Sequence, residues 1–209
     1  MNVFDDFFKR LQRRASRDQA YNPYKDPHLL NNLKHYFEYL YNLDQNHILL
    51  IGEAPGYTGC RLTGIPFSSA KLIEESLHPL FTHLRDKIVL EKSESEKTAG
   101  IVWEELEGRD IIPIFWNAFP FHPFKKGNQR TNRAPTAKEV EEGQWYIKEL
   151  IKRFQPTTIA AIGRKGEIAL QKLQIESEVK YIRHPSYGGK PDFIKHINEV
   201  MLIHSSHHD

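Results

Sequence analysis

Three segments of this chain place a polar side chain beside glycine or proline, each directly after an apolar run. They are GEAPG (52–56), WNAFPFHP (116–123) and RHPSYGG (183–189). The amide of Asn117 carries donors and an acceptor, which is what reading an imide edge requires. His184 can serve as a general acid or as a donor to a developing anion. These residue types together point to recognition of a flat, polar ring.

The glycines of GEAPG raise the question of a phosphate site. The segment lacks the Gly-Lys-Ser/Thr ending of a P-loop, so no lysine is placed to reach phosphates. It also lacks the G-x-G-x-x-G spacing of a dinucleotide site. Glycines at these positions favour a different interpretation, in which backbone N–H groups approach a flat ligand closely. A small-molecule phosphate- or nucleotide-binding protein stays open as an interpretation that rests on this loop alone.

Each candidate residue also has a structural interpretation. Phe67 ends the stiff segment GIPF (64–67) and is either a core residue or a ring that stacks on a ligand. Asn117 can equally close a turn, and His184 can be a hydrogen-bonded residue without a chemical role. The combination of segments, rather than any one residue, carries the functional argument.

Apolar runs and helical periodicity indicate the elements that must position these residues. The predicted strands are 47–51, 111–116, 158–162 and 179–182, and the predicted helices are 4–17, 29–43, 68–86, 136–154, 165–173 and 193–201. Thr136 and Glu139 form a capping-box motif at the start of the helix that ends at Phe154. Pro113 indicates an edge strand or an irregularity.

Strand–helix alternation with continuous apolar strands predicts a parallel sheet covered on both faces. The expected fold is α/β, a three-layer α/β/α arrangement with a central, mainly parallel four-stranded sheet and N-terminal helices packed alongside. We expect a single domain over 1–209, with an N-terminal helical segment (1–46) and an α/β core (47–203). In such folds ligands bind at the carboxyl ends of strands, where the polar segments fall.

Composition narrows the class of protein. A hydrophobic fraction of 39% supports a core, and a formal net charge of +2 means that any polyanion must be met by local basic patches. The single cysteine excludes a disulfide framework and an all-cysteine iron–sulfur cluster within one chain. No apolar run is long enough to span a bilayer, and the N-terminus lacks a secretory signal. We therefore expect a soluble, cytoplasmic protein.

The order and spacing of the motifs resemble the uracil-DNA glycosylase superfamily, and within it the family-four and family-five-like bacterial and archaeal members. The resemblance covers about residues 47–203 and rests on GEAPG, GIPF, Asn117, HPS and the segment NRAPT (132–136). It implies a monomeric, cofactor-free, monofunctional DNA glycosylase. Such an enzyme flips uracil out of the DNA stack and leaves an abasic site.

The resemblance also implies roles for single residues. Phe67 would stack on the flipped base, Asn117 would read its edge, and His184 would donate to the uracil oxygen as charge builds. Glu53, the one carboxylate of its loop, would orient water or stabilise the sugar cation. Backbone N–H groups of the same loop would contact the base or a phosphate. The implied substrate-binding positions there are Gly52, Ala54, Pro55, Gly56 and Tyr57.

Departures from the family pattern bear on the chemistry. In the superfamily's best-known branch the activating carboxylate stands at the position of Ala54, and a tyrosine that blocks a 5-methyl group stands at that of Gly56. Residues 57–60 (YTGC) replace acidic residues of the family-four pattern. Because the chain has one cysteine rather than four, the iron–sulfur cluster is predicted to be absent. Helices 4–17 and 29–43 are expected to buttress the fold instead.

Basic residues after the strands predict a rim that follows DNA phosphates, with ordinary solvated loops as the alternative. The predicted DNA-binding positions are Lys125, Lys126, Arg130, Arg133, Arg164, Lys165, Arg183, Ser186, Tyr187 and Lys190. Tyr187 is either the wedge that enters the gap left by the flipped base or a surface turn residue. The cations of the N-terminal helix, from Lys9 to Arg17, are assigned to its solvation.

Two further functions stay open within this resemblance. A glycosylase for another lesion, such as hypoxanthine or mismatched thymine, fits a pocket that lacks the blocking tyrosine. A catalytically silent protein that binds nucleic acid or a base fits the missing carboxylate at Ala54, although Glu53 argues against it.

Overall fold

The computed structural model describes residues 3–17, 19–45, 47–173, 175 and 178–206. The chain divides into two compact units, and it passes between them several times. The first, called the helical unit, comprises Met1–Leu43, Ala54–Gly100 and Pro120–Ala134. The second, called the sheet unit, comprises Asp44–Glu53, Ile101–Phe119 and Pro135–Asp209. Each unit is described by itself.

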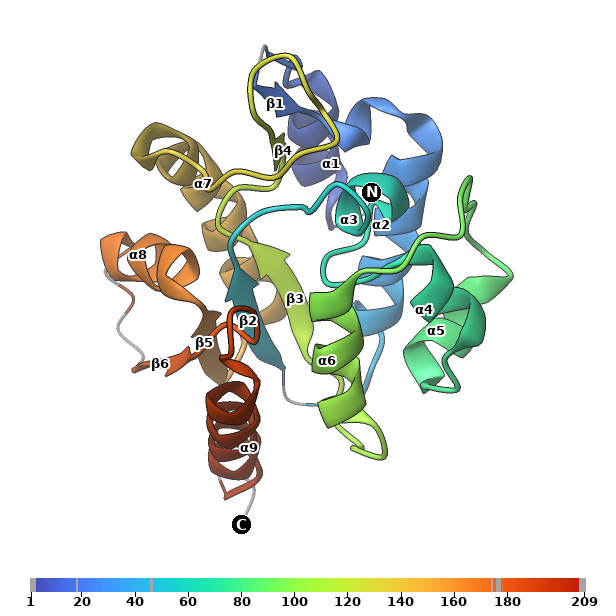
Figure 1. The fold of residues 1–209 in the computed structure, drawn as a ribbon. Helices are drawn as coiled ribbons and strands as arrows, with labels where there is room; N and C mark the ends of the chain where they lie inside the picture. Colours follow the sequence, from blue (N-terminus) through green and yellow to red (C-terminus); the bar gives the residue numbers. More distant parts are fainter. Residues whose placement is uncertain (1–2, 18, 46, 174, 176–177, 207–209) are drawn as a thin grey trace. The chain divides into compact units, whose positions relative to one another are not determined.

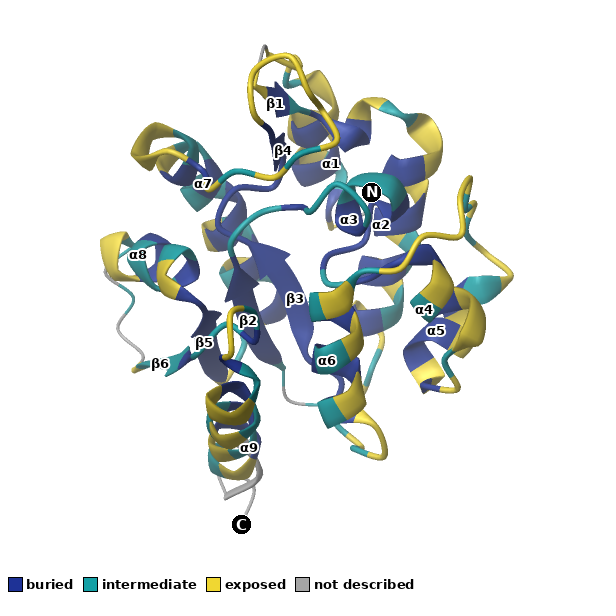
Figure 2. Ribbon diagram, viewed as in Figure 1, coloured by how far each residue is buried: buried dark blue, intermediate teal, exposed yellow. Residues whose placement is uncertain are grey.

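The sheet unit is built on a four-stranded parallel sheet of order β3-β2-β5-β6 (Figure 1). The strands are β2 (Ile48–Gly52), β3 (Ile114–Asn117), β5 (Thr158–Ile162) and β6 (Val179–Ile182). Every residue of β2, β3 and β5 is buried, as the dark ribbons of Figure 2 show. Continuous rather than alternating burial confirms the predicted parallel sheet that is covered on both faces.

Helices cover the two faces of this sheet. Successive side chains of a strand point to opposite faces. Phe115 of β3 contacts Trp103 of α6 (Lys97–Leu106; ring centroids 5.3 Å apart), whereas the next residue, Trp116, contacts Tyr146 of α7 (Ala137–Phe154; 6.5 Å). The α/β class and the three-layer arrangement predicted from the sequence are therefore confirmed for this unit.

Each helical layer contains a second helix. In one layer α8 (Arg164–Lys172) packs against α7 and against β2, β5 and β6. In the other, α9 (Lys190–Ser206) packs on β5 and β6 and is tied to α6 by an ion pair between Lys190 and Glu104 (Nζ to Oε2, 2.9 Å). The capping box of Thr136 and Glu139 is present at the start of α7, as predicted.

The helical unit holds α1 (Asp5–Arg13), α2 (Pro27–Tyr41), α3 (Cys60–Thr63), α4 (Ala70–Glu75) and α5 (Pro79–Arg85). It also contains the short 3₁₀ segment Pro23–Lys25 and a two-stranded antiparallel sheet of β1 (Ala20–Tyr21) and β4 (His122–Pro123). An aromatic cluster joins α1 to α2, with Phe4 stacked on Phe37 at 5.3 Å between ring centroids.

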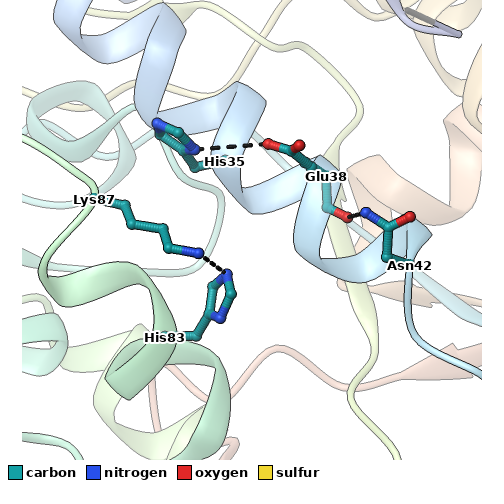
Figure 3. Close-up of polar contacts among 5 residues, drawn as sticks. All are labelled: His35, Glu38, Asn42, His83 and Lys87. Carbon is teal, nitrogen blue, oxygen red and sulfur yellow. Dashed lines mark hydrogen bonds and ion pairs between the residues drawn. The ribbon is translucent and has the colours of Figure 1, made fainter.

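Helix α5 packs against α2 in the same unit, and Figure 3 shows polar contacts within each of these two neighbouring segments. The His83 ring lies 4.4 Å from the ring of Tyr39 between centroids, and Lys87 Nζ donates to His83 Nε2 at 2.7 Å. On α2 itself, His35 lies near Glu38, with Nδ1 and Oε2 3.7 Å apart. The ring contact between Tyr39 and His83 joins the two helices, whereas the other two contacts are local to each segment.

Some sequence expectations need correction. The helix expected over 68–86 is two helices, α4 and α5, separated at 76–78, because His78 caps α5 and Pro79 occupies its first turn. The second strand begins at Ile114 rather than 111, after Pro113, and it is an edge strand as the proline indicated. Helix α6, which begins inside the charged stretch 91–99, was not expected to be a helix through Leu106.

Among the described residues, no helix combines the length and the apolar character needed to cross a membrane.

Gly143 of α7 permits a close approach between this helix and the end of β3. A Cβ at this position would lie 1.8 Å from the carbonyl oxygen of Ala118. Backbone cannot yield cheaply to such a clash, so we expect Gly143→Ala to lower the free energy of unfolding by roughly 1–3 kcal/mol in urea denaturation.

Gly100→Ala is the matched control, because Gly100 also lies inside a helix but has nothing within 4 Å of a built Cβ. Alanine has a higher helix propensity than glycine, so this substitution should raise the free energy of unfolding by up to about 1 kcal/mol. Equal effects of the two substitutions would contradict the close-approach explanation.

Candidate functional site

Parallel pairing brings two of the polar segments to neighbouring positions at the carboxyl edge of the sheet. Gly52, the last residue of β2, is the register partner of Asn117, the last residue of β3. The pairing continues beyond the strands, because the N–H of Ala118 donates to Gly52 O (2.9 Å) and that of Phe119 donates to Glu53 O (3.1 Å). Backbone hydrogen bonds therefore hold Glu53 and Asn117 at adjacent strand ends.

Asn117 is a buried polar residue whose side chain is not used by the fold. Its exposed fraction is 4%. Within the described part of the chain, its side-chain amide takes part in no hydrogen bond. Its amide atoms are not among the fully buried side-chain atoms that lack a partner, so they reach solvent at the edge of the sheet. An amide left open at a strand end is therefore suited to a ligand that supplies the missing partners.

Glu53 sits half-buried at the bend that follows β2. Burial raises the pKa of its carboxyl group above the ordinary value of 4.5, and the positive charge of Lys165 opposes this rise. Lys165 comes from α8, which follows the neighbouring strand β5. The sequence analysis assigned this lysine to DNA phosphates, whereas the structure also gives it an electrostatic effect on Glu53.

The loop after β6 fixes the hydrogen bonding of His184. The backbone N–H of Ser186 donates to His184 Nδ1 (3.2 Å), and the Ser186 hydroxyl lies 2.7 Å from the same nitrogen. Because Nδ1 accepts from a backbone N–H, the neutral ring carries its proton on Nε2. A Cβ at Gly189 would lie 2.2 Å from His184 O, so this loop closes tightly only with glycine there. The arrangement presents Nε2–H as a hydrogen-bond donor.

Two candidate aromatic residues adopt the left-handed backbone region. In the helical unit, Phe67 has φ +51° and is half-buried. In the sheet unit, Tyr187 has φ +53° and its exposed fraction is 99%. Such a conformation costs a bulky residue about 1–3 kcal/mol and is found mostly at functional sites. Each ring is therefore held where the local backbone alone would not place it.

The loop 54–57, which follows Glu53, is anchored inside the helical unit. His122 of β4 lies with Nδ1 2.8 Å from the carbonyl oxygen of Pro55. Asn132 accepts a hydrogen bond from the backbone N–H of Tyr57 through Oδ1 (3.0 Å). Both anchors are far from the loop in the sequence. The loop is thus shaped by contacts with β4 and with the segment that follows it, as well as by its own glycine and proline.

His122 faces a carbonyl oxygen at each ring nitrogen, since Nε2 lies 3.0 Å from Gln129 O. A neutral ring has one N–H and can donate to only one of the two carbonyls. Burial lowers the pKa of His122 below its ordinary value of 6.5, against the two carbonyl contacts that raise it, and the charges of Arg61 and Arg133 lower it further. The ring is therefore neutral near pH 7 and gains its second donor only in acid.

Gly56 leaves open space beside the anchored loop. The nearest group to a Cβ built at this position is Nδ2 of Asn132, at 3.9 Å, which is ordinary van der Waals contact. A bulky substituent of a ligand would meet no side chain of residue 56 itself.

The predicted basic positions fall into two classes. Lys125, Lys126 and Arg130 are exposed, whereas Arg133 donates to the backbone carbonyls of Phe124, Ala134 and Gln19 and so acts in the fold. In the sheet unit, Arg164 pairs with Glu167 and Lys190 pairs with Glu104, while Arg183 is half-buried before His184.

The candidate residues are distributed over both units. The sheet unit holds Gly52, Glu53, Asn117, Arg164, Lys165, Arg183, His184, Ser186, Tyr187 and Lys190, and the helical unit holds Ala54, Pro55, Gly56, Tyr57, Phe67, Lys125, Lys126, Arg130 and Arg133. His122 was not among the residues predicted from the sequence, and Asn132 had no predicted role of its own. In the described ranges, no group of three or more His, Cys, Asp and Glu residues is arranged to hold a metal ion.

Comparison with known proteins identifies a family and a fold. The family model described as the uracil DNA glycosylase superfamily matches residues 39–207. Among solved structures, wild-type SMUG2 from Pedobacter heparinus is similar, with a TM-score of 0.66 over 100% of both chains at 18% sequence identity. A search of curated proteins gave no match. The structural similarity concerns the fold, and the family model covers most of the chain.

The contacts of His122 predict how a substitution should depend on pH. Below pH 6.5 the unfolded chain takes up a proton at this histidine before the folded protein does, so wild type loses stability that the His122→Gln variant does not lose. The destabilisation caused by His122→Gln should therefore be smaller at about pH 5 than at about pH 7.5 in urea denaturation.

His28→Gln, at an exposed histidine of the same unit, is the control. A destabilisation by His122→Gln that grows on acidification would show that the buried ring is charged in the folded state near neutral pH.

Proposed function

Because the chain belongs to the uracil DNA glycosylase superfamily, we propose that it excises uracil from DNA and leaves an abasic site. Members of this superfamily are DNA glycosylases, hydrolases of the N-glycosidic bond that act in base excision repair, and DNA is their substrate. The proposal of uracil as the excised base rests on Asn117. This buried residue has a side-chain amide that is open at the carboxyl edge of the sheet. An amide that both donates and accepts complements the O–C–N–H edge of uracil.

The proposed chemistry separates two developing charges. The base leaves as an anion while the sugar becomes cationic. The Nε2–H of His184, held as donor by the Ser186 contact to Nδ1, would stabilise the charge on the uracil oxygen. Phe67 would stack on the base once it has left the DNA helix, and the backbone N–H groups of the loop 54–57 would lie along it. Water, rather than a protein amine, would complete the hydrolysis, which makes the enzyme monofunctional.

Glu53 is the residue that we propose to orient the attacking water. A carboxylate orients water and stabilises a sugar cation only in its ionised form. Burial disfavours that form, and the charge of Lys165 favours it. We therefore propose that Lys165 acts mainly by keeping Glu53 ionised, in addition to any contact with a phosphate. Glu53 would have the role of the carboxylate that, in the best-known branch of the superfamily, stands at the position of Ala54.

DNA contacts would come from the exposed cations of the loop 125–130 and from the end of the sheet. Tyr187, almost fully exposed on a strained backbone between Ser186 and two glycines, is the proposed wedge for the gap left by the flipped base. The two cations that already pair with glutamates, Arg164 and Lys190, would exchange these partners for phosphates.

A second candidate function is the excision of a bulkier or different base, such as hypoxanthine or mismatched thymine. The open space at Gly56 favours it, because no side chain at this position would reject a substituent on the ring. A panel of oligonucleotides that each carry one lesion distinguishes the two candidates by their relative excision rates.

The function is tested by incubating the purified protein with uracil-containing oligonucleotides and measuring abasic sites by alkaline cleavage. We expect excision by wild type and a loss of about 10²–10³-fold in Asn117→Ala and in His184→Ala, the usual effect of removing one donor to a developing charge.

Asn198→Ala, which alters an asparagine on α9 that bonds Arg109, is the matched control and should keep full activity. DNA binding without excision of any lesion would replace the enzyme proposal with a binding function. Full activity of both site variants would refute their assigned roles.

The role of Glu53 is tested by the pH dependence of the single-turnover excision rate. An ionised carboxylate is required, so the rate should fall as pH drops through a pKa that lies above 4.5. Glu53→Gln should lower the rate and remove this acid limb. Lys165→Met should shift the limb to higher pH, because the charge that favours ionisation is lost. An acid limb that persists unchanged in both variants would assign the titration to another group.

A further inference from the structure

Among the exposed cations of the helical unit that form no ion pair within the part of the chain that the structure describes, five come from two segments that are distant in the sequence. They are Arg13, Arg17, Lys125, Lys126 and Arg130. Other basic residues of the protein are paired with acidic groups, among them Lys71 with Glu75 and Lys180 with Glu178. Unpaired cations that gather on one surface repel one another, so their shared position calls for an anionic partner.

The fold brings these cations together from two distant segments. An antiparallel bridge joins Arg17 to Ala20, and another joins Lys125 to Asn128, so each segment forms a tight turn. The strands next to these turns, β1 and β4, pair with each other. Beyond that pairing, the N–H of Phe124 donates to Gln19 O at 3.0 Å. The two turns therefore lie side by side at the same end of the helical unit (Figure 1).

Buried contacts fix the N-terminal segment in this position. The Asn22 side chain, fully buried, donates from Nδ2 to the carbonyl oxygens of Leu11 and Arg14, both at 2.7 Å. The guanidinium of Arg14 is turned inward, where it lies 4.4 Å from the centroid of the Phe121 ring and donates to Ala20 O (3.2 Å). Arg14 thus serves the fold, whereas its neighbours Arg13 and Arg17 face solvent.

The two segments carry several basic residues and few acidic ones, and Asp18 directly follows Arg17 in the sequence. Residues 7–17 and 119–134 contain no aspartate or glutamate. The N-terminal segment also lies outside the region that the family model matches, which begins at residue 39. A basic surface that joins this segment to the loop 125–130 therefore includes residues outside the region that the family model matches.

We propose that Arg13 and Arg17 extend the DNA-binding surface of the loop 125–130 and contact the phosphate backbone outside the damaged nucleotide. The inference rests on DNA as the substrate of this glycosylase. Each phosphate contact releases condensed counterions, so it strengthens binding without reading sequence. These arginines would raise affinity for any duplex and leave the chemical step unchanged.

The test measures binding of a fluorescent, undamaged duplex of about 20 base pairs by anisotropy between about 50 and 200 mM salt. In R13Q/R17Q, affinity at about 100 mM salt should fall roughly tenfold or more, and the slope of log K against log salt should lose about 2. K125Q/K126Q should behave similarly. K92Q/K97Q, which removes two exposed charges from the segment near α6, is the matched control and should bind as wild type does.

The excision assay adds an independent readout. With R13Q/R17Q, KM should rise while the single-turnover rate at saturating enzyme stays within about twofold of wild type, and thermal unfolding should show an intact fold. Wild-type affinity of R13Q/R17Q beside weakened binding by K125Q/K126Q would overturn this inference and leave the proposed function standing. An equal loss in K92Q/K97Q would also overturn it. Binding that follows the expectation without excision of any lesion would instead refute the proposed function alone.

Discussion

The parallel pairing of β2 with β3 on one side and β5 on the other is the constraint on which the candidate site depends. Parallel strands end at the same edge, so segments separated by more than sixty residues reach that edge together. Because the ladder continues past Gly52 and Asn117, the positions of Glu53 and the amide are set by backbone hydrogen bonds. Side chains on such a frame keep their geometry without relying on flexible loops.

Electrostatics then decide what these side chains can do. Ser186 holds His184 as a donor, and the charge of Lys165 opposes the rise that burial causes in the pKa of Glu53. In the proposed site, each of these side chains thus depends on a neighbouring residue for its hydrogen bonding or its pKa. The same holds in the helical unit, where His122 and Asn132 shape the loop 54–57 through its backbone.

Sequence patterns predicted the central part of the fold well. The strand at 158–162 and the capping box of α7 have strong local signals, namely an apolar run and a Thr-x-x-Glu motif, whereas the strand at 179–182 contains Lys180 and has a weaker signal. The pairing of β1 with β4 has none, since two-residue strands about one hundred positions apart are joined only by tertiary packing. For the site, strand-end residues follow from the parallel-sheet rule. The roles of His122 and Asn132 do not, because they act on carbonyl and N–H groups far away along the chain.

The left-handed backbone of Phe67 and Tyr187 has a consequence for protein engineering. Glycine adopts this conformation freely, so glycine at either position would relieve local strain while removing the ring. Consensus or stability-guided redesign would therefore favour glycine at these two positions. At either position, a substitution to glycine is expected to raise stability and to lower activity. This is the trade-off between stability and activity that is seen in many enzymes.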